Sequence, residues 1–463
     1  MRPPYLKAIT IAAPALILVI SVAYAEPGAK ERRRELRQIE NEFTGRGAAM
    51  VDPSALAGLE EYLAAGLTRN PTLKAAFYEW KAALQNVSRQ FSLPDPQFSY
   101  TDYLEEVETR VGPQERAYSV RQMFPFPDKL WIRKSKAFRS SEAAYHNFVK
   151  TRLDLISSIA DAYFEFAYLS KAVLITSENL KLLQSFESVA QSKYSSGLTK
   201  NQDLLKVQVE LGKLENELKS LEDLRSPVTS RLIALLNLPH TTQLPWPEDQ
   251  LEMLPSDDDY ADMNGLIDEL RKNNPQLMAL AASVAGSEDE LKLAQREYVP
   301  DFTVGVTQID TGPAVNPSMA DSGKDPLTVM VAVNVPIWFH RINAEIRQAR
   351  ASLEAAELKR EGAEDELLSR LAMVHYKLRD ARRQAQLYND ALIPKAVQTL
   401  NATKSAYESG GMDFLSLIDA QRMLLSFQMT YYRHNANFYQ RLYQIQALLG
   451  EVTSLDQSQG DGK

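Results

Sequence analysis

The sequence contains no cysteine, and its five histidines are scattered. The missing cysteine excludes disulfides, thiolate metal sites, a cysteine nucleophile and a lipid-modified amino terminus. The histidines form no H-E-x-x-H or paired-ligand motif. There is also no phosphate-binding loop, nucleophile constellation or carboxylate pair with catalytic spacing. The sequence therefore predicts no catalytic residue, cofactor or metal site, and the chain is not expected to be an enzyme.

Excess positive charge is also missing. The formal net charge of the 463 residues is −8, which argues against a nucleic-acid partner because phosphate binding needs a basic surface. The chain is 44% hydrophobic and 24% charged, so it has enough apolar residues to order a large structure.

Long hydrophobic runs are absent beyond the amino terminus. Arg2 and Lys7 precede the apolar run Ala8–Val22, and Ala23-Tyr24-Ala25 has the form of a signal-peptidase site. We therefore predict a secretory signal peptide over residues 1–25. The alternative is a membrane anchor, but about 15 apolar residues fall short of the roughly 20 needed to span a bilayer. Since no later segment is apolar enough to be a membrane helix, entry into a membrane would require strands.

The chain is duplicated, because short motifs recur in the same order in its two halves. Three of the matches, those that begin at Tyr194, Gln208 and Ala234, share one offset (407 − 194, 421 − 208 and 447 − 234 all equal 213), which chance rarely produces. The matched segments are Asn70-Pro71-Thr72-Leu73 with Asn274-Pro275-Gln276-Leu277, Pro94–Tyr100 with Pro300–Val304, Phe124-Pro125-Phe126 with Val335-Pro336-Ile337, Tyr194–Gly197 with Tyr407–Gly410, Gln208 with Gln421, and Ala234-Leu235-Leu236 with Ala447-Leu448-Leu449.

These matches divide the chain into segments. Between the signal peptide and the first repeat lies a polar segment, 26–54, and the predicted repeats span 55–239 and 264–450. A linker, 240–263, joins the repeats, and 451–463 has the composition of a disordered tail. Each repeat has a helical stretch (Leu56–Phe91, then Leu266–Tyr298), two short alternating runs, a very long helical run and a shorter one.

The long helical runs, Lys129–Ser195 and Arg341–Ser409, would each extend on the order of 100 Å. Their shorter partners have heptad spacing, with apolar residues recurring every three or four positions. Taken alone, the helices favour an ordinary antiparallel coiled-coil hairpin. The heptad positions are Leu204, Val207, Leu211, Leu214, Leu218 and Leu221 in the first repeat, and Leu417, Ala420, Leu424, Phe427 and Tyr431 in the second.

The alternating runs are typical of strands with one apolar face. Phe302, Val304 and Val306 alternate with small polar residues, and apolar residues alternate through Leu327–Val335. Such runs of about 9–11 residues suit a membrane barrel, although a half-buried sheet in a soluble domain has the same pattern. The first pair, around Phe98 and Tyr118, is weaker. The segments Leu104–Glu115 and Asp310–Pro326 are predicted to be the exposed loops.

Proline marks every predicted boundary between strands and helices, because it stops a helix and cannot donate to a sheet. Trp131 and Trp338 follow the second and fourth strands, a placement that suits an aromatic girdle at a membrane edge. Four strands cannot close a barrel, and open strand edges are not tolerated in lipid. The sequence therefore predicts an oligomer, and three copies would supply twelve strands. The boundary prolines are Pro94, Pro96, Pro125, Pro127, Pro300 and Pro336.

The residues Tyr194–Leu198 and Asp203–Gln208, repeated at Tyr407–Gln421, resemble the TolC-type outer membrane efflux proteins. The resemblance covers about Leu56 to Gly450. It implies a mainly α fold with a small membrane β part, in which three duplicated subunits form a coiled-coil α-barrel continued by a 12-stranded β-barrel. It further implies an outer-membrane homotrimer in contact with lipid that extends into the periplasm, docks an adaptor (a membrane fusion protein) and serves an inner-membrane pump of the resistance–nodulation–division class.

The resemblance also implies roles for residues at the helical tips. Asp203 and Tyr407 match the family's closing link, and Asp419 matches the inner of two ring aspartates. Ser416 stands where the outer ring aspartate would be, and Met412 stands where a family member has arginine, so the closing contacts are expected to differ. The predicted adaptor-docking turns are Gly197-Leu198-Thr199 and Gly410-Gly411-Met412.

The function that the sequence predicts is a passive exit duct for a tripartite efflux pump, with a gate at its periplasmic end. The alternatives are the same architecture in a type I protein-secretion system, or a soluble periplasmic coiled-coil scaffold. The segment from Pro94 through Pro113 to Leu130 resembles the heavy-metal-efflux branch, but the twelve methionines form no ladder suited to soft metals. Metal, drug and protein substrates therefore stay open at this stage.

Overall fold

The computed structural model describes residues 29–44, 56–197, 201–247, 251, 254, 260–316 and 318–451. The predicted signal peptide, the tail beyond residue 451, parts of the linker (248–250, 252–253 and 255–259), and Leu198 and Thr199 of the predicted tips lie outside these residues. The chain divides into two units, Met1–Ala48 and Ala49–Lys463. The described part of the first unit is one helix, α1 (Ala29–Thr44), in which Arg32 and Glu35 form an ion pair at 3.0 Å.

In the second unit, the helical stretch that precedes the strands of each repeat, predicted as Leu56–Phe91 and Leu266–Tyr298, is two helices. The first is broken into α2 (Leu59–Arg69) and α3 (Pro71–Gln90), and the second into α7 (Met263–Asn273) and α8 (Pro275–Arg296). Each break falls at an Asn-Pro pair. The asparagine side chain accepts hydrogen bonds from the first free backbone N–H groups of the next helix, and proline at the first helical position needs no such partner.

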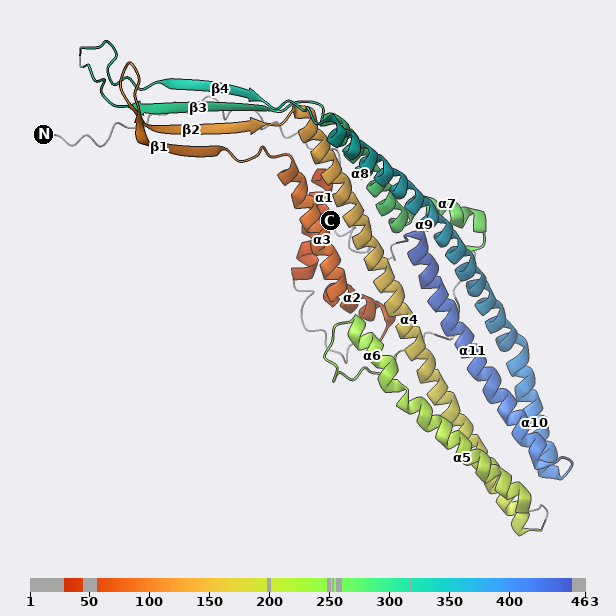
Figure 1. Cartoon of the computed structure of the whole chain (residues 1–463). Helices are drawn as coiled ribbons and strands as arrows, with labels where there is room; N and C mark the ends of the chain where they lie inside the picture. The colour runs from red at the N-terminus through yellow and green to blue at the C-terminus, as the bar shows by residue number, and fades with distance from the viewer. Residues whose placement is uncertain are drawn as a thin grey trace, which may run out of the picture. The chain divides into compact units, whose positions relative to one another are not determined.

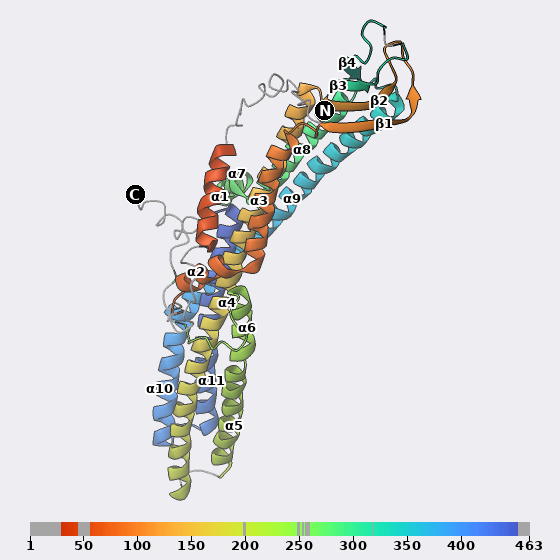
Figure 2. The same cartoon turned by 90° about the vertical axis from the view of Figure 1, so that its left-hand side faces the viewer.

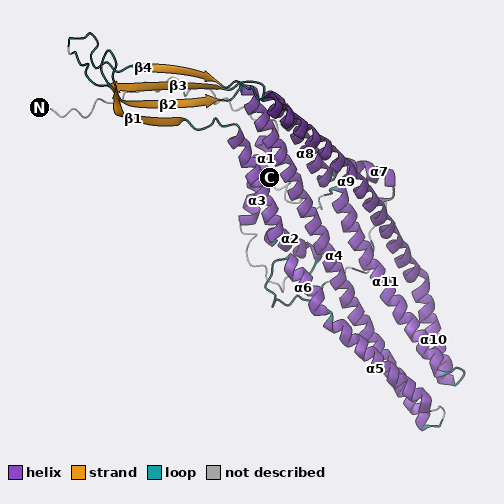
Figure 3. Ribbon diagram, in the orientation of Figure 1, coloured by secondary structure: helices purple, strands orange, loops and turns teal. Residues whose placement is uncertain are grey.

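The four predicted strands form one antiparallel sheet in the order β1-β2-β3-β4. Their bounds are β1 (Gln97–Val107), β2 (Gln114–Phe124), β3 (Phe302–Thr311) and β4 (Leu327–Val333). The loop between β1 and β2 is shorter than predicted, because β1 continues past Leu104 to a bulge before Val107. β2 and β3 pair across the sequence duplication, so the two repeats contribute one hairpin each to a shared sheet (Figure 3).

The sheet has one mainly apolar face and one mainly polar face, because residues opposite each other in an antiparallel pair point the same way. Near the loops the first face becomes charged, where Arg116 lies 3.7 Å from Asp102. The pairs Phe98–Val120, Val120–Val306 and Val306–Val329 place aromatic and aliphatic side chains on one face. Ser99, Ser119, Thr307 and Thr328 lie on the other. The apolar face is solvent-exposed in the single chain, with Phe98 at 68% and Val329 at 70%.

Two very long helical runs leave the sheet, as predicted (Figure 1). α4 (Pro127–Ser195) is unbroken, whereas its counterpart comprises α9 (Phe339–Leu387), a π-helical turn η4 (Tyr388–Leu392) and α10 (Ile393–Ser409). Equivalent buried positions are 212 residues apart before this turn (Leu130 and Ile342, 342 − 130) and 213 after it (Ala190 and Thr403, 403 − 190). The π turn is thus a one-residue insertion. It ends two residues before Pro394, the second residue of α10, whose ring an uninterrupted α-helix would not accommodate.

The shorter runs return along the long ones, as α5 (Asn201–Asp223) and α6 (Arg225–Leu235) in the first repeat and α11 (Phe414–Leu449) in the second. The heptad leucines of α5 are buried from Leu204 to Leu214 and pack with Leu417 and Leu424 of α11. Phe427 and Tyr431 are only half-buried. Figure 2 shows the two hairpins ending side by side, away from the sheet.

None of the helices among the described residues is both long and apolar enough to cross a bilayer.

Candidate functional site at the helical tips

The chain reverses at two glycine turns where the hairpins end. Gly197 has a φ of +72° and Gly410 a φ of +84°, the left-handed conformation that ends a helix with little strain only at glycine. After Gly410, the Gly411 N–H donates to the carbonyl of Ala406 at 2.8 Å, which closes the end of α10. Met412 is exposed beside this turn. The predicted tip residues that the structure describes therefore lie together at one end of the helices.

Tyr407 is buried just inside these turns. Its ring packs edge-on against Phe414, with centroids 5.3 Å apart, and the Nζ atom of Lys193 lies 4.5 Å from the ring centroid. Lys193 also donates a hydrogen bond to the Tyr407 carbonyl. Because Lys193 lies in the last turn of α4 and Tyr407 in the last turn of α10, this contact joins the tips of the two repeats. The sequence analysis missed Lys193.

Asp203 lies half-buried in the first turn of α5, next to Leu204. Leu204 and Tyr407 belong to one buried cluster, so the two residues of the predicted closing link lie at the same end of one helical bundle.

Ser416 takes part in the cap of α11. Asp413 precedes the helix, and its carboxylate accepts the Ser416 N–H at 3.1 Å and the Ser416 hydroxyl at 2.5 Å. These hydrogen bonds hold the pKa of Asp413 below its ordinary value. The sequence position that matches a family ring aspartate is thus occupied here by a serine that fixes the start of the helix.

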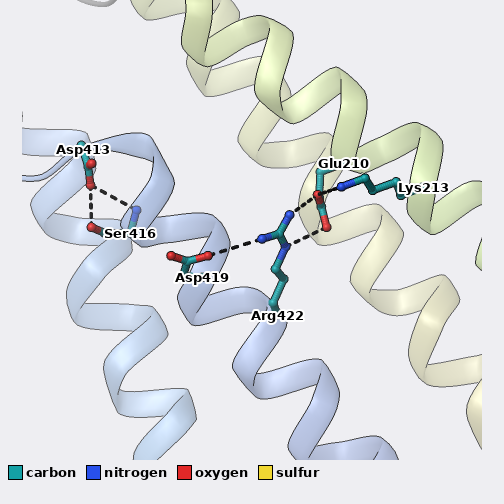
Figure 4. A network of polar contacts seen from close by, with 6 residues as sticks. All are labelled: Glu210, Lys213, Asp413, Ser416, Asp419 and Arg422. Atoms are coloured by element: carbon teal, nitrogen blue, oxygen red, sulfur yellow. Dashed lines mark hydrogen bonds and ion pairs between the residues drawn. The ribbon is translucent and has the colours of Figure 1, made fainter.

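Arg422 connects the hairpins one turn beyond Asp419 (Figure 4). Its Nε donates to Glu210 Oε1 at 2.8 Å, a second nitrogen donates to Oε2, and a third lies 3.5 Å from Asp419. Lys213 lies 3.7 Å from the same Glu210 carboxylate. The Arg422 hydrogen bonds lower the pKa of Glu210, and Glu210 in turn raises the pKa of Arg422.

The sequence analysis predicted Asp419 but missed its partner Arg422 and the bridge to Glu210. The only available signal was the i,i+3 spacing of Asp419 and Arg422 on a helix, which is common on solvated surfaces. Glu210 is 212 residues away in the sequence, so no local pattern could have indicated it.

An open groove lies beside this bridge, between α5 and α11. Its walls are mainly apolar, with Leu205 and Val209 on α5 and Leu415 and Ile418 on α11. Leu205, Val209 and Leu415 are exposed in the single chain. Exposed apolar side chains in one groove are typical of a surface that contacts another protein.

The predicted girdle tryptophans lie at the opposite end, where the sheet joins the helices. The Trp131 ring packs at a tilt of 58° against the Phe91 ring, with centroids 5.0 Å apart, and the Lys134 Nζ lies 4.9 Å from the Trp131 ring centroid. Trp338 precedes α9 and is 63% exposed. Exposed indole rings beside an apolar sheet face suit a membrane–water boundary.

Metal-ligating side chains do not cluster anywhere in the part of the chain that the structure describes.

Comparison with known proteins identifies the family. Residues 266–451 match the family model described as outer membrane efflux protein. The cobalt-zinc-cadmium resistance protein CzcC of Cupriavidus metallidurans is 23% identical over 88% of this chain and 94% of its own length. The outer-membrane channel OprN has the same fold (TM-score 0.71, 17% identity, 89% of this chain and 92% of OprN), as does VceC of Vibrio cholerae (TM-score 0.69, 18% identity, 85% and 96%).

The chain is thus recognised as an outer membrane efflux protein through residues 266–451, which carry the family match. It is accordingly a protein of the outer membrane that acts in efflux and is not an enzyme. The resemblance stated from the tip residues is confirmed, and so is the mainly helical, long-helix fold.

Proposed function

We propose that this protein is the passive exit duct of a tripartite efflux pump, closed at its helical tips until an adaptor opens it. The observation that carries the proposal is the single-chain sheet, whose apolar face is exposed and whose two outer edges, on β1 and β4, pair with no other strand of the described residues. Such a sheet is unfavourable for one chain in water or in lipid, because its edge N–H and C=O groups lack partners.

Assembly of three copies would give the edge N–H and C=O groups partners. Pairing of β4 with β1 of the next copy gives a closed ring of twelve strands, with the apolar face toward lipid and the serine and threonine face toward the lumen. The long helices that continue from the strands would then form a helical barrel in the periplasm. In this arrangement the repeats 55–239 and 264–450 are equivalent units, joined by the linker 240–263.

The tips carry the proposed gate. Asp203, Tyr407, Ser416 and Asp419 were predicted from the family resemblance, and we add the Arg422–Glu210 bridge, which ties α11 to α5. An adaptor that binds the turns around Gly197 and Gly410 and the groove at Leu205 and Leu415 would separate the hairpins. Opening this gate requires breaking ion pairs whose cation, Arg422, is 45% exposed, so water can replace the lost partner at little cost in free energy.

The gate assignment is tested by replacing Asp203 with Asn and Tyr407 with Phe and recording single-channel conductance in planar bilayers. Both variants are expected to conduct more than the parent protein, because each removes the side-chain group that the proposed closing link would use. Unchanged conductance in both would contradict the assignment.

For the substrate, we propose divalent metal ions delivered by a proton-driven inner-membrane pump. The support is the metal-resistance relative CzcC, which aligns over nearly its whole length. A strain lacking the gene should become sensitive to cobalt, zinc or cadmium, with normal tolerance of lipophilic drugs, and the intact gene should restore tolerance. Sensitivity to drugs alone would contradict the metal assignment and leave the duct itself untouched.

A further inference from the structure

A buried ion pair joins the two repeats where the sheet meets the helices. Lys129, at the start of α4, is 1% exposed, and its Nζ lies 3.1 Å from Asp301 and 3.9 Å from Glu297. Asp301, just before β3, also accepts the backbone N–H of Phe126 at 2.9 Å. The Asp301 carboxylate therefore ties the start of β3 to the start of α4, the helix that follows the neighbouring strand β2.

The duplication repeats side-chain contacts as well as sequence. Asn70 caps α3 and donates from its amide to the Leu235 carbonyl at 2.9 Å. Asn274 caps α8 and donates in the same way to the Leu448 carbonyl at 2.8 Å. A contact made by one repeat therefore has a counterpart in the other, and the Lys129–Asp301 pair should have one too.

The counterparts are Arg341 and Asp95. Arg341 is the third residue of α9 as Lys129 is of α4, and the buried residues that follow, Leu130 and Ile342, match. Asp95 follows Pro94 before β1 as Asp301 follows Pro300 before β3. Both counterparts carry the charge that the pair needs.

Within one chain these two residues cannot meet, because β1 and β4 are the opposite edges of the sheet. Asp95 is exposed and makes no hydrogen bond or ion pair within the described residues. Arg341 is half-exposed and bonds to Glu345 one turn along its own helix at 2.8 Å, an arrangement worth little in water. Each residue is thus available to a partner outside the chain.

We propose that Arg341 pairs with Asp95 of a second copy of this chain, where the β4 edge of one copy meets the β1 edge of the next. The proposal rests on the proposed ring of copies, and it goes further by fixing the register of their contact. β2 and β3 pair Phe124 with Phe302. In the duplication, Val335 is the counterpart of Phe124 and Pro96 is the counterpart of Phe302. The same register therefore places Val335 of one copy opposite Pro96 of the next, Val333 opposite Phe98, and Ala332 opposite Ser99.

The inferred register agrees with the two faces of the sheet. Val333 and Phe98 both lie on the apolar face, and Ala332 and Ser99 both lie on the polar one. A shift by one residue would place each apolar side chain beside a polar face, so the register is strongly specified.

Charge reversal tests the ion pair. Asp95→Arg and Arg341→Asp should each speed dissociation of the detergent-purified oligomer, by roughly tenfold or more, because each places like charges together where water is excluded. The double variant restores opposite charges and should recover most of the parent stability. Glu345→Gln, which removes only the partner of Arg341 within its own helix, is the matched control and should dissociate at the parent rate. Failure of the double variant to recover while both single variants dissociate fast would contradict the pair.

Cysteine cross-linking tests the register, and the chain has no native cysteine to interfere. Ser99→Cys combined with Ala332→Cys should form disulfide-linked multimers on mild oxidation. In the control, Ser99→Cys is combined with Val331→Cys, whose side chain lies on the other face, and no multimers should form. If the parent forms a stable oligomer but the Ser99→Cys and Ala332→Cys variant does not cross-link, the inferred register is wrong, while the proposed duct function is unaffected. A parent protein that never assembles overturns both.

Discussion

The two ends of the helical unit hold their charged contacts in opposite ways. At the sheet junction, Lys129 is 1% exposed and Asp301 is 15% exposed, and they bridge elements from both repeats. At the tips, the bridging carboxylate Glu210 is 16% exposed, much like Asp301, but its cation Arg422 is 45% exposed and the second partner of Arg422, Asp419, is 61% exposed. A buried pair is costly to break because separation leaves an unpaired charge in a dry site, whereas water replaces the partner of an exposed charge.

The comparison indicates a rigid end and a releasable end. The junction has to keep strands and helices aligned throughout the transport cycle. The tips have to open and reclose, so they use contacts that a binding partner can displace.

The largest effect is expected at the junction. Lys129→Ala should destabilise the protein by about 3–5 kcal/mol, because it leaves Asp301 buried without its cation. Thermal unfolding in detergent measures the loss. The double variant Lys129→Met with Asp301→Asn removes both charges and should unfold closer to the parent, and an unchanged melting temperature in Lys129→Ala would contradict a buried, paired lysine.

A smaller loss is expected at the helix breaks. Asn70→Ala and Asn274→Ala each remove a helix cap and a hydrogen bond to a carbonyl of the other helical segment. Each substitution should lower the free energy of unfolding by about 1–2 kcal/mol, and the two losses should be similar if the repeats are equivalent. Thermal unfolding of the two variants measures both losses of stability. A large difference between the two melting temperatures would show that the two caps are not equivalent.

At the tips, function should change more than stability. Arg422→Ala and Glu210→Gln should each cost no more than about 1 kcal/mol, because Arg422 is exposed. Both should nevertheless open the gate, which sensitises cells to vancomycin, a molecule that the outer membrane normally excludes. Lys213→Ala, which removes only a 3.7 Å contact to Glu210, is the control. Equal vancomycin tolerance in all three variants would show that the bridge does not close the tube.

The smallest effect is expected from pH. The pKa of Glu210 is below its ordinary value of 4.5, so the folded state favours the carboxylate. The stabilisation from the bridge is therefore fully present above pH 4.5 and is lost as the pH falls through the lowered pKa. Conductance of the parent protein should rise in that acidic range, whereas Glu210→Gln should lack this step. An acid-induced rise of the same size in both proteins would assign it to another group.

Much of the fold follows from local patterns that the sequence displays directly. The alternation in Phe302–Val306 gives a strand because side chains alternate between faces, and the three- and four-residue steps from Leu204 give a buried helix face. Gly197 and Gly410 mark the tips because a left-handed residue is needed there.

What the sequence analysis missed depends on contacts between distant segments. Lys129 had no signal of its own, since a lysine at a helix start is usually solvated, and Asp301 is 172 residues away (301 − 129). The Arg422–Glu210 bridge and the Lys193–Tyr407 contact share this property. The π turn at Tyr388–Leu392 was missed for a different reason. The three sequence matches with an offset of 213 all lie after the π turn. The offset of 212 before the turn becomes visible only when the buried positions of the two long helices are compared.

The central claim is that one chain is an incomplete tube, and native mass spectrometry of the detergent-extracted protein tests it most directly. The account predicts a complex of three copies that separates into single chains only when the sheet edges are disrupted. A monodisperse single chain under gentle extraction, with the sheet still folded, would contradict it.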